Sequence, residues 1–102
     1  MERILCAAIW IDDGITTYVH QPKNIKQGFV IAGRRHHNCI TLLAMLQGLR
    51  KDRNNKDEVQ GFITSLDRFV DRQEAMHIAI IANQLIERTG TNKAALYSED
   101  LY

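Results

Sequence analysis

The sequence has little of what would assign it to a specialised class of protein. It carries two cysteines among 102 residues and a formal net charge of only +1. Two cysteines are too few for the disulfide framework of a small secreted domain. A balanced charge lacks the dominant basic field that a nucleic-acid coat or a membrane-surface binder needs. We therefore expect no nucleic acid polymer and no membrane among its partners.

The chain also lacks a long hydrophobic run and any C-x-x-C spacing. Cys6 and Cys39 lie inside separate apolar stretches, so we interpret both as reduced, buried thiols of an intracellular protein. The apolar stretch RILCAAIWI near the N-terminus meets Asp12 and Asp13 too early for a signal peptide, and it is too short to span a bilayer. These features predict a cytoplasmic protein.

Turn signals and apolar periodicity predict a single α+β domain, residues 1–102, that opens with an antiparallel meander. A tight hairpin turn is expected at Asp12-Asp13-Gly14, because glycine tolerates the positive φ of such turns. A second turn is expected at Ser65–Arg68, before a short return at Phe69-Val70. The expected strands, which are rich in β-branched and aromatic residues, are 3–11, 15–20, 28–32 and 59–64.

Residues that recur at helical spacing predict two amphipathic helices. The first is expected from about Asn38 to Leu49, and residues 50–58 after it form a solvated loop of mixed charge. The second begins with the N-cap pair Asp71 and Glu74 and runs to a stop at Thr89-Gly90.

The apolar surface of the second helix is unusually wide. Met76, Ile80 and Ile81 lie outside its main stripe and extend the apolar surface beyond half of the circumference. A helix that is apolar on two sides needs a second partner, so we expect a homodimer interface here. The alternative is a deeper core within the same chain.

The stretch GRRHHNC, residues 33–39, gathers four nitrogen-rich side chains where a strand gives way to a helix. The first-turn amides of a helix attract anions, and arginines fork onto phosphate oxygens. Arg34, Arg35 and His36 are therefore candidates to bind a phosphate-sized anion. The alternative is that the arginines face water and the histidines cap the helix. A metal is disfavoured, because no acidic residue lies nearby and H-x-x-x-H does not occur.

The stretch GFITS, residues 61–65, offers a second set of binding groups. Gly61 permits a close approach of backbone or ligand, Phe62 has a flat face that can stack on a nucleobase, and Thr64 and Ser65 carry hydroxyl groups. The simpler interpretation is that Phe62 belongs to the core.

No G-x-S-x-G, Walker or G-x-G-x-x-G motif occurs, and Asp12-Asp13 already has a structural role in a turn. The residues therefore offer no motif of these enzyme classes. Two alternatives stay open: a phosphodiesterase or RNase-like enzyme that uses the Arg/His cluster, and a small protein-binding module that uses the wide helix face.

Several stretches together resemble a known family. They are HQPKN (20–24), GRRHHNC (33–39), GFITS (61–65), RFVDRQEA (68–75) and LYSEDLY (96–102). In this order they are similar to the phage Thoeris anti-defence sponge family, the first-described type, and the resemblance spans nearly the full chain. It implies a protein that sequesters cyclic ADP-ribose isomers in the cytoplasm of the host bacterium without catalysis. We expect no cofactor and no metal.

The resemblance also implies partners and site residues. Some family members hold cyclic oligonucleotides, so cyclic di- and trinucleotides are candidate ligands, and a hexamer built as a trimer of dimers is the candidate assembly beyond the homodimer. A pocket at each end of the dimer would place Phe62 and an arginine of Arg34–His36 around the adenine. Arg72 and Lys23 would meet the pyrophosphate, and Thr64 and Ser65 would add hydroxyl bonds. On this basis Phe62→Ala and Arg35→Ala should weaken binding with little change in thermal midpoint.

Overall fold

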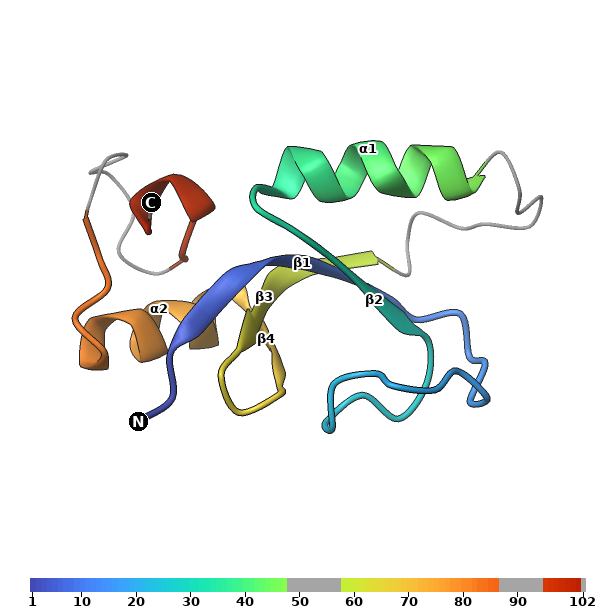
Figure 1. Cartoon of the computed structure of the whole chain (residues 1–102), viewed down its shortest axis with the longest axis horizontal. Coiled ribbons are helices and arrows are strands. Elements are labelled where there is room, and N and C mark those ends of the chain that lie inside the picture. Colours follow the sequence, from blue (N-terminus) through green and yellow to red (C-terminus); the bar gives the residue numbers. More distant parts are fainter. Residues whose placement is uncertain (48–57, 87–94, 102) are drawn as a thin grey trace.

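The computed structural model describes residues 1–47, 58–86 and 95–101, and its elements form an α+β fold (Figure 1). Within these ranges the strands make one antiparallel sheet in the order β2-β1-β3-β4. The elements are β1 (Ile4–Ile11), β2 (Phe29–Gly33), α1 (His36–Gln47), β3 (Glu58–Thr64), β4 (Phe69–Asp71), α2 (Arg72–Ile81) and the 3-10 helix η2 (Ser98–Asp100). The predicted fold class is confirmed.

Both helices pack on one face of the sheet. Ala7 of β1 lies opposite Phe62 of β3, and Ile9 of β1 lies opposite Ile31 of β2. Directly opposed residues share a face, so these side chains form one apolar surface. The buried residues that the helices add to it are Cys39 and Leu43 from α1 and Ala75, Met76 and Ala79 from α2.

The predicted strand at 15–20 is wrong. β1 is flanked by β2 on one edge and by β3 on the other, so the residues after Gly14 have no edge of β1 left to pair with. Gly14 does take the positive φ, 78°, that the predicted turn requires. The side chain of Asp13 then organises an irregular segment, accepting hydrogen bonds from the Ile15 N–H (3.0 Å) and the Tyr18 hydroxyl (2.7 Å).

The segment between β1 and β2 instead binds the two edge strands of the sheet through side-chain amides. Asn24 accepts from the N–H of Phe69 (2.8 Å) and donates to its carbonyl (2.7 Å), as a neighbouring strand would. The side-chain Oε1 atom of Gln21 accepts from the N–H of Val30 (2.8 Å). Edge strands with unpaired backbone groups invite aggregation, so these contacts explain part of the HQPKN stretch.

The helices differ from prediction at their ends. α1 begins at His36, two residues earlier than expected, and Leu49 and residues 50–57 lie outside the described residues. The Asp71 cap is confirmed, since its carboxylate accepts from the N–H of Glu74 at 2.8 Å. However, α2 ends at Ile81 rather than near residue 89.

The early end of α2 has a local cause. Asn83 has a φ of 56°, which breaks the helix, and the side chain of Gln84 then accepts from the Ile4 N–H (2.7 Å) and donates to the Ile4 carbonyl (2.8 Å). A longer helix would forfeit these contacts to β1. The predicted stop at 89–90 lies outside the described residues.

The three residues that widen the apolar surface of α2 differ in their burial. Met76 is buried, which agrees with the alternative of a deeper core, whereas Ile80 and Ile81 stay 53% and 71% exposed. The apolar surface left for a partner is therefore the C-terminal end of the helix.

The β3–β4 turn at Ser65–Arg68 is confirmed. The Thr64 N–H donates to the Arg68 carbonyl at 2.9 Å, and Asp67 takes a φ of 60°. Both cysteines are free thiols, and burial raises the pKa of Cys39 to about 11, so that thiol stays protonated and unreactive.

Candidate functional site

The N-termini of α1 and α2 face the same stretch of β3. The Nε2 atom of His36 donates to the carbonyl of Gly61 at 2.7 Å, since a carbonyl oxygen can only accept. One guanidinium nitrogen of Arg72 donates to the Gln60 side chain at 2.6 Å. Neighbouring residues of one strand therefore hold an imidazole and a guanidinium close together.

His36 is held as a neutral hydrogen-bond donor. The residue is 8% exposed, and its ring makes a T-shaped contact with Phe62, with 4.9 Å between ring centroids. Desolvation lowers the pKa of His36 and the charge of Arg72 lowers it further, while the Gly61 bond and Glu99 act in the opposite direction. The imidazole thus carries no charge at neutral pH.

Arg72 is fixed in place by three contacts. Besides Gln60, its guanidinium donates to the Leu96 carbonyl at 2.8 Å and lies over the ring of Tyr97, 4.7 Å from the centroid. Burial lowers the pKa of Arg72, and Tyr97 and Glu99 oppose that shift. Arginine is protonated throughout the physiological range, so this is a preorganised cation.

The N-terminus of α1 has an unusual cap. Arg35 stands at the cap position: its N–H donates to the Asn38 side chain (2.9 Å), and its carbonyl accepts from the Asn38 N–H (3.0 Å). Helices usually place an acceptor side chain here, but arginine can only donate. The first turn also holds no acidic residue. A cation at this end opposes the helix dipole, whereas an anion is favoured there.

The expected site residues fall into two groups. One group lies where the two helices begin and consists of Arg34, Arg35, His36, Phe62 and Arg72. Its three arginines, Arg34, Arg35 and Arg72, form what we call the cation group. Lys23, Thr64 and Ser65 lie instead beside the β3–β4 turn. There the Lys23 N–H donates to the Asp67 carbonyl at 2.8 Å, and the Ser65 hydroxyl accepts from the Arg3 N–H at 2.9 Å.

The second group belongs to a network that fastens the N-terminus. Glu2 binds Arg68 through both carboxylate oxygens, at 2.8 and 2.9 Å, and accepts from the Thr64 hydroxyl. Arg68 also reaches Glu74 at 3.0 Å. The hydrogen bonds from Arg68 and then Thr64 lower the pKa of Glu2 to about 2. The Thr64 hydroxyl is therefore engaged inside the protein.

Phe62 offers no exposed ring face. It is 0% exposed and lies in the core, as the simpler interpretation of GFITS held. The aromatic side chain that contacts the cation group is Tyr97, beside Arg72, and it was not among the predicted site residues. Its only signal was its place in the LYSEDLY tail, where neither order nor spacing could position it.

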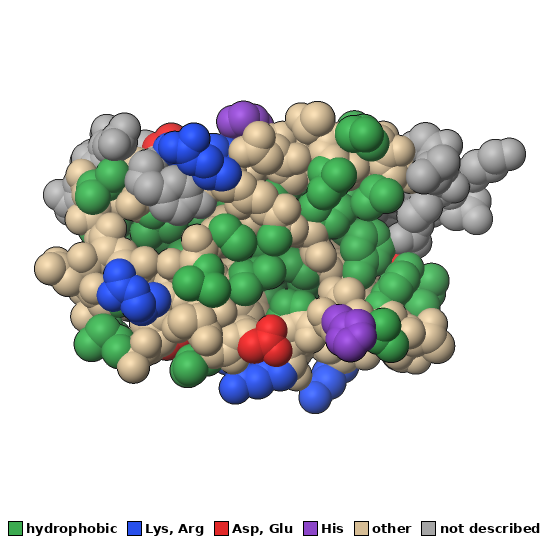
Figure 2. Space-filling model, in the orientation of Figure 1, with side chains coloured by type: hydrophobic (Ala, Val, Ile, Leu, Met, Phe, Trp, Pro, Cys, Tyr) green, Lys and Arg blue, Asp and Glu red, His purple; other side chains and the backbone are tan. Residues whose placement is uncertain are grey.

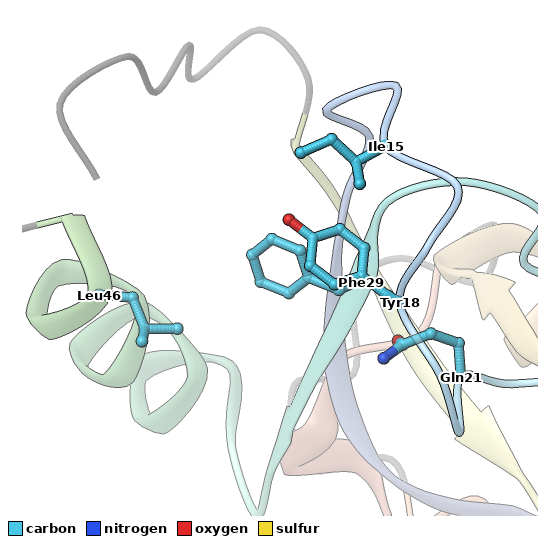
Figure 3. A pocket seen from close by; sticks show the side chains of 5 residues that line it. All are labelled: Ile15, Tyr18, Gln21, Phe29 and Leu46. Atoms are coloured by element: carbon cyan, nitrogen blue, oxygen red, sulfur yellow. The ribbon is translucent and has the colours of Figure 1, made fainter. Parts of the chain in front are cut away.

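A separate hollow of about 510 Å³ lies beside the C-terminal half of α1 (Figure 3). It is lined by Ile15, Tyr18, Gln21, Phe29 and Leu46, with the Tyr18 and Phe29 rings in edge contact at 5.1 Å. On the face of the molecule that Figure 2 shows, hydrophobic side chains extend from the middle toward the C-terminal end of α1. The described residues that line the hollow are mostly apolar, so the hollow suits an apolar group.

Within the described ranges, no cluster of three or more His, Cys, Asp or Glu side chains is arranged to hold a metal ion. The same ranges contain no helix with the length and apolar character needed to cross a membrane.

Comparison with known proteins finds one family. The model of the family described as phage T4 y16D protein matches residues 3–102, which is nearly the whole chain. No curated protein and no solved structure gave a match. The match covers the sheet, both helices and the cation group at their N-termini, so the chain belongs to the phage T4 y16D protein family.

Proposed function

We propose that this protein is a non-catalytic sponge that binds and sequesters cyclic ADP-ribose isomers and thereby inhibits bacterial anti-phage defence. The observation that carries the proposal is the pair of helix N-termini over β3, with Arg72 held beside the Arg34–His36 stretch. Membership of a phage family and the resemblance in sequence are consistent with it.

Tight binding of a nucleotide is favoured when the binding side chains are already oriented before the ligand arrives. A sponge competes with a sensor of trace signal and so needs tight binding, and nanomolar affinity corresponds to about −12 kcal/mol. Arg72 is already oriented by Leu96, Gln60 and Tyr97, so its ordering cost is largely met before a ligand arrives. Charge-assisted bonds from arginine to phosphate are among the strong hydrogen bonds in proteins.

The state of His36 favours binding over bond breaking. Phosphodiester cleavage by an Arg/His cluster requires an imidazole that can deliver or accept a proton near neutral pH. The Nε2 proton of His36 is already donated to Gly61, and burial lowers the pKa of the ring. His36 is therefore a poor general acid or base for the phosphodiesterase alternative.

The proposed function also includes a cellular location, further ligands and an oligomeric assembly. A phage protein of this kind would act in the cytoplasm of the host bacterium, with cyclic di- and trinucleotides as further candidate ligands. The exposed Ile80 and Ile81 support a homodimer through the end of α2, from which a trimer of dimers would be assembled.

The test separates sponge from enzyme. The protein is incubated with cyclic ADP-ribose isomers and denatured by heat, and the released nucleotide is analysed by chromatography. Intact ligand supports the sponge, and linearised product contradicts it. In calorimetry, Arg34→Gln and Arg35→Gln should each weaken binding by about tenfold or more. Lys26→Gln, an exposed lysine between β1 and β2, is the charge-matched control and should have no effect.

The hollow favours one second candidate, a protein-binding module. Its apolar lining adjoins α1, whose Leu42 and Met45 are 44% and 68% exposed, and such a surface suits an apolar peptide segment. Calorimetry that gives no heat with any cyclic nucleotide, together with retained dimerisation, would favour this candidate over the sponge.

A further inference from the structure

The C-terminal segment, residues 95–101, carries a tyrosine to the cation group. Leu96 is fully buried, and its backbone is tied to α2 from both sides. Its N–H donates to the Arg72 carbonyl at 2.9 Å, and its carbonyl accepts from the Arg72 guanidinium at 2.8 Å. Tyr97, the next residue, is therefore held at a fixed place beside Arg72.

The ring of Tyr97 has the Arg72 cation over one face, and the residue is still partly exposed to solvent. The guanidinium carbon of Arg72 lies 4.7 Å from the ring centroid, and the residue is 37% exposed. A cation over an aromatic face is itself favourable, and it fixes the ring orientation. A ring fixed in this way and still exposed is a platform for stacking, and every nucleobase has a π-face to place on it.

We propose that Tyr97 is the aromatic surface on which the purine ring of the ligand stacks. This inference rests on the proposed function, because it names the residue that recognises the base of the same nucleotide. The ring expected for that role, Phe62, is enclosed in the core.

Glu99 indicates which end of the ligand meets this segment. Its charge acts on both Arg72 and His36, which places a carboxylate on the C-terminal side of the cation group. A phosphate there would be repelled, whereas a neutral purine would not. The base therefore lies against Tyr97, and the phosphates lie between Arg72 and the Arg34–His36 end of α1, away from Glu99.

The experiment measures cyclic ADP-ribose binding by calorimetry for the wild type, Tyr97→Leu and Tyr97→Phe. The matched control is Tyr18→Leu, because Tyr18 is also 37% exposed but lines the separate hollow. Loss of base stacking should weaken binding about 5- to 100-fold in Tyr97→Leu. Tyr97→Phe and Tyr18→Leu should bind like the wild type. Inorganic pyrophosphate, which has no base, should bind Tyr97→Leu and the wild type equally.

The outcomes separate this inference from the proposed function. If the wild type binds and Tyr97→Leu binds equally well, stacking on Tyr97 is overturned and the sponge stands. If Tyr97→Leu weakens cyclic ADP-ribose and pyrophosphate by the same factor, the tyrosine only positions Arg72, which also overturns the inference. If the folded wild type binds no cyclic ADP-ribose isomer, the proposed function fails, and this inference falls with it.

Discussion

Truncation of Phe62 should destabilise the protein severely, in contrast to the expectation from sequence that its role is confined to the ligand. Phe62 is 0% exposed, packs in the hydrophobic core and makes a T-shaped contact with His36, with 4.9 Å between ring centroids. Replacing a buried phenylalanine by alanine costs about 3–5 kcal/mol, and domains of this size have roughly 5–15 kcal/mol in total. Phe62→Ala should therefore lower the thermal midpoint by more than about 10 °C.

The assay is urea unfolding at neutral pH followed by circular dichroism, with Phe62→Leu as the milder variant. Phe62→Leu keeps most of the apolar volume and should lose less than half as much stability as Phe62→Ala. An alanine variant whose free energy of unfolding stays within about 1 kcal/mol of the wild type would contradict the burial of this ring.

Three further predictions follow from individual contacts. Glu2→Gln should lose about 1–2 kcal/mol at pH 7, discounted for the partial exposure of the Arg68 pair. Because the pKa of Glu2 falls from 4.5 to about 2 on folding, this difference from the wild type should shrink as the pH drops from 4.5 toward 2; a difference that stays constant over that range in pH-dependent unfolding would refute it. Gly61→Ala should unfold at a much lower urea concentration than the wild type, because an added Cβ would overlap the Val70 carbonyl, and a wild-type midpoint would contradict this close approach. Ile81→Glu should convert a dimer to a monomer in analytical ultracentrifugation without loss of stability, since its side chain is 71% exposed, and an unchanged sedimentation coefficient would exclude this end of α2 as the interface.

The fold was predictable where local chemistry decides the structure. Asp71 and Glu74 mark the start of α2 by their spacing alone, and the Ser65–Arg68 turn is a local event. The segment 15–20 was not predictable, because its β-branched pattern fits a strand and only the long-range pairing of β1 with β3 removes its partner. The end of α2 depends in the same way on a distant contact, that of Gln84 with Ile4.

The candidate site could be predicted only in part. The stretch GRRHHNC predicted a cation-rich start of a helix, and α1 does begin at His36. Nothing in the sequence indicated that Arg72 would reach Gln60, or that the tail would return to bring Tyr97 onto Arg72. Thr64 illustrates the opposite error, because a hydroxyl that looked available is bound to Glu2, 62 residues away in the sequence.

The most direct test of the sponge proposal is a calorimetric titration of the wild-type protein with cyclic ADP-ribose isomers at low and at physiological salt. We expect saturable, nanomolar binding that weakens as salt increases, because phosphate recognition by Arg34, Arg35 and Arg72 is partly screened by ions. A folded protein that gives no heat of binding with any of these isomers at either salt concentration would contradict the central claim.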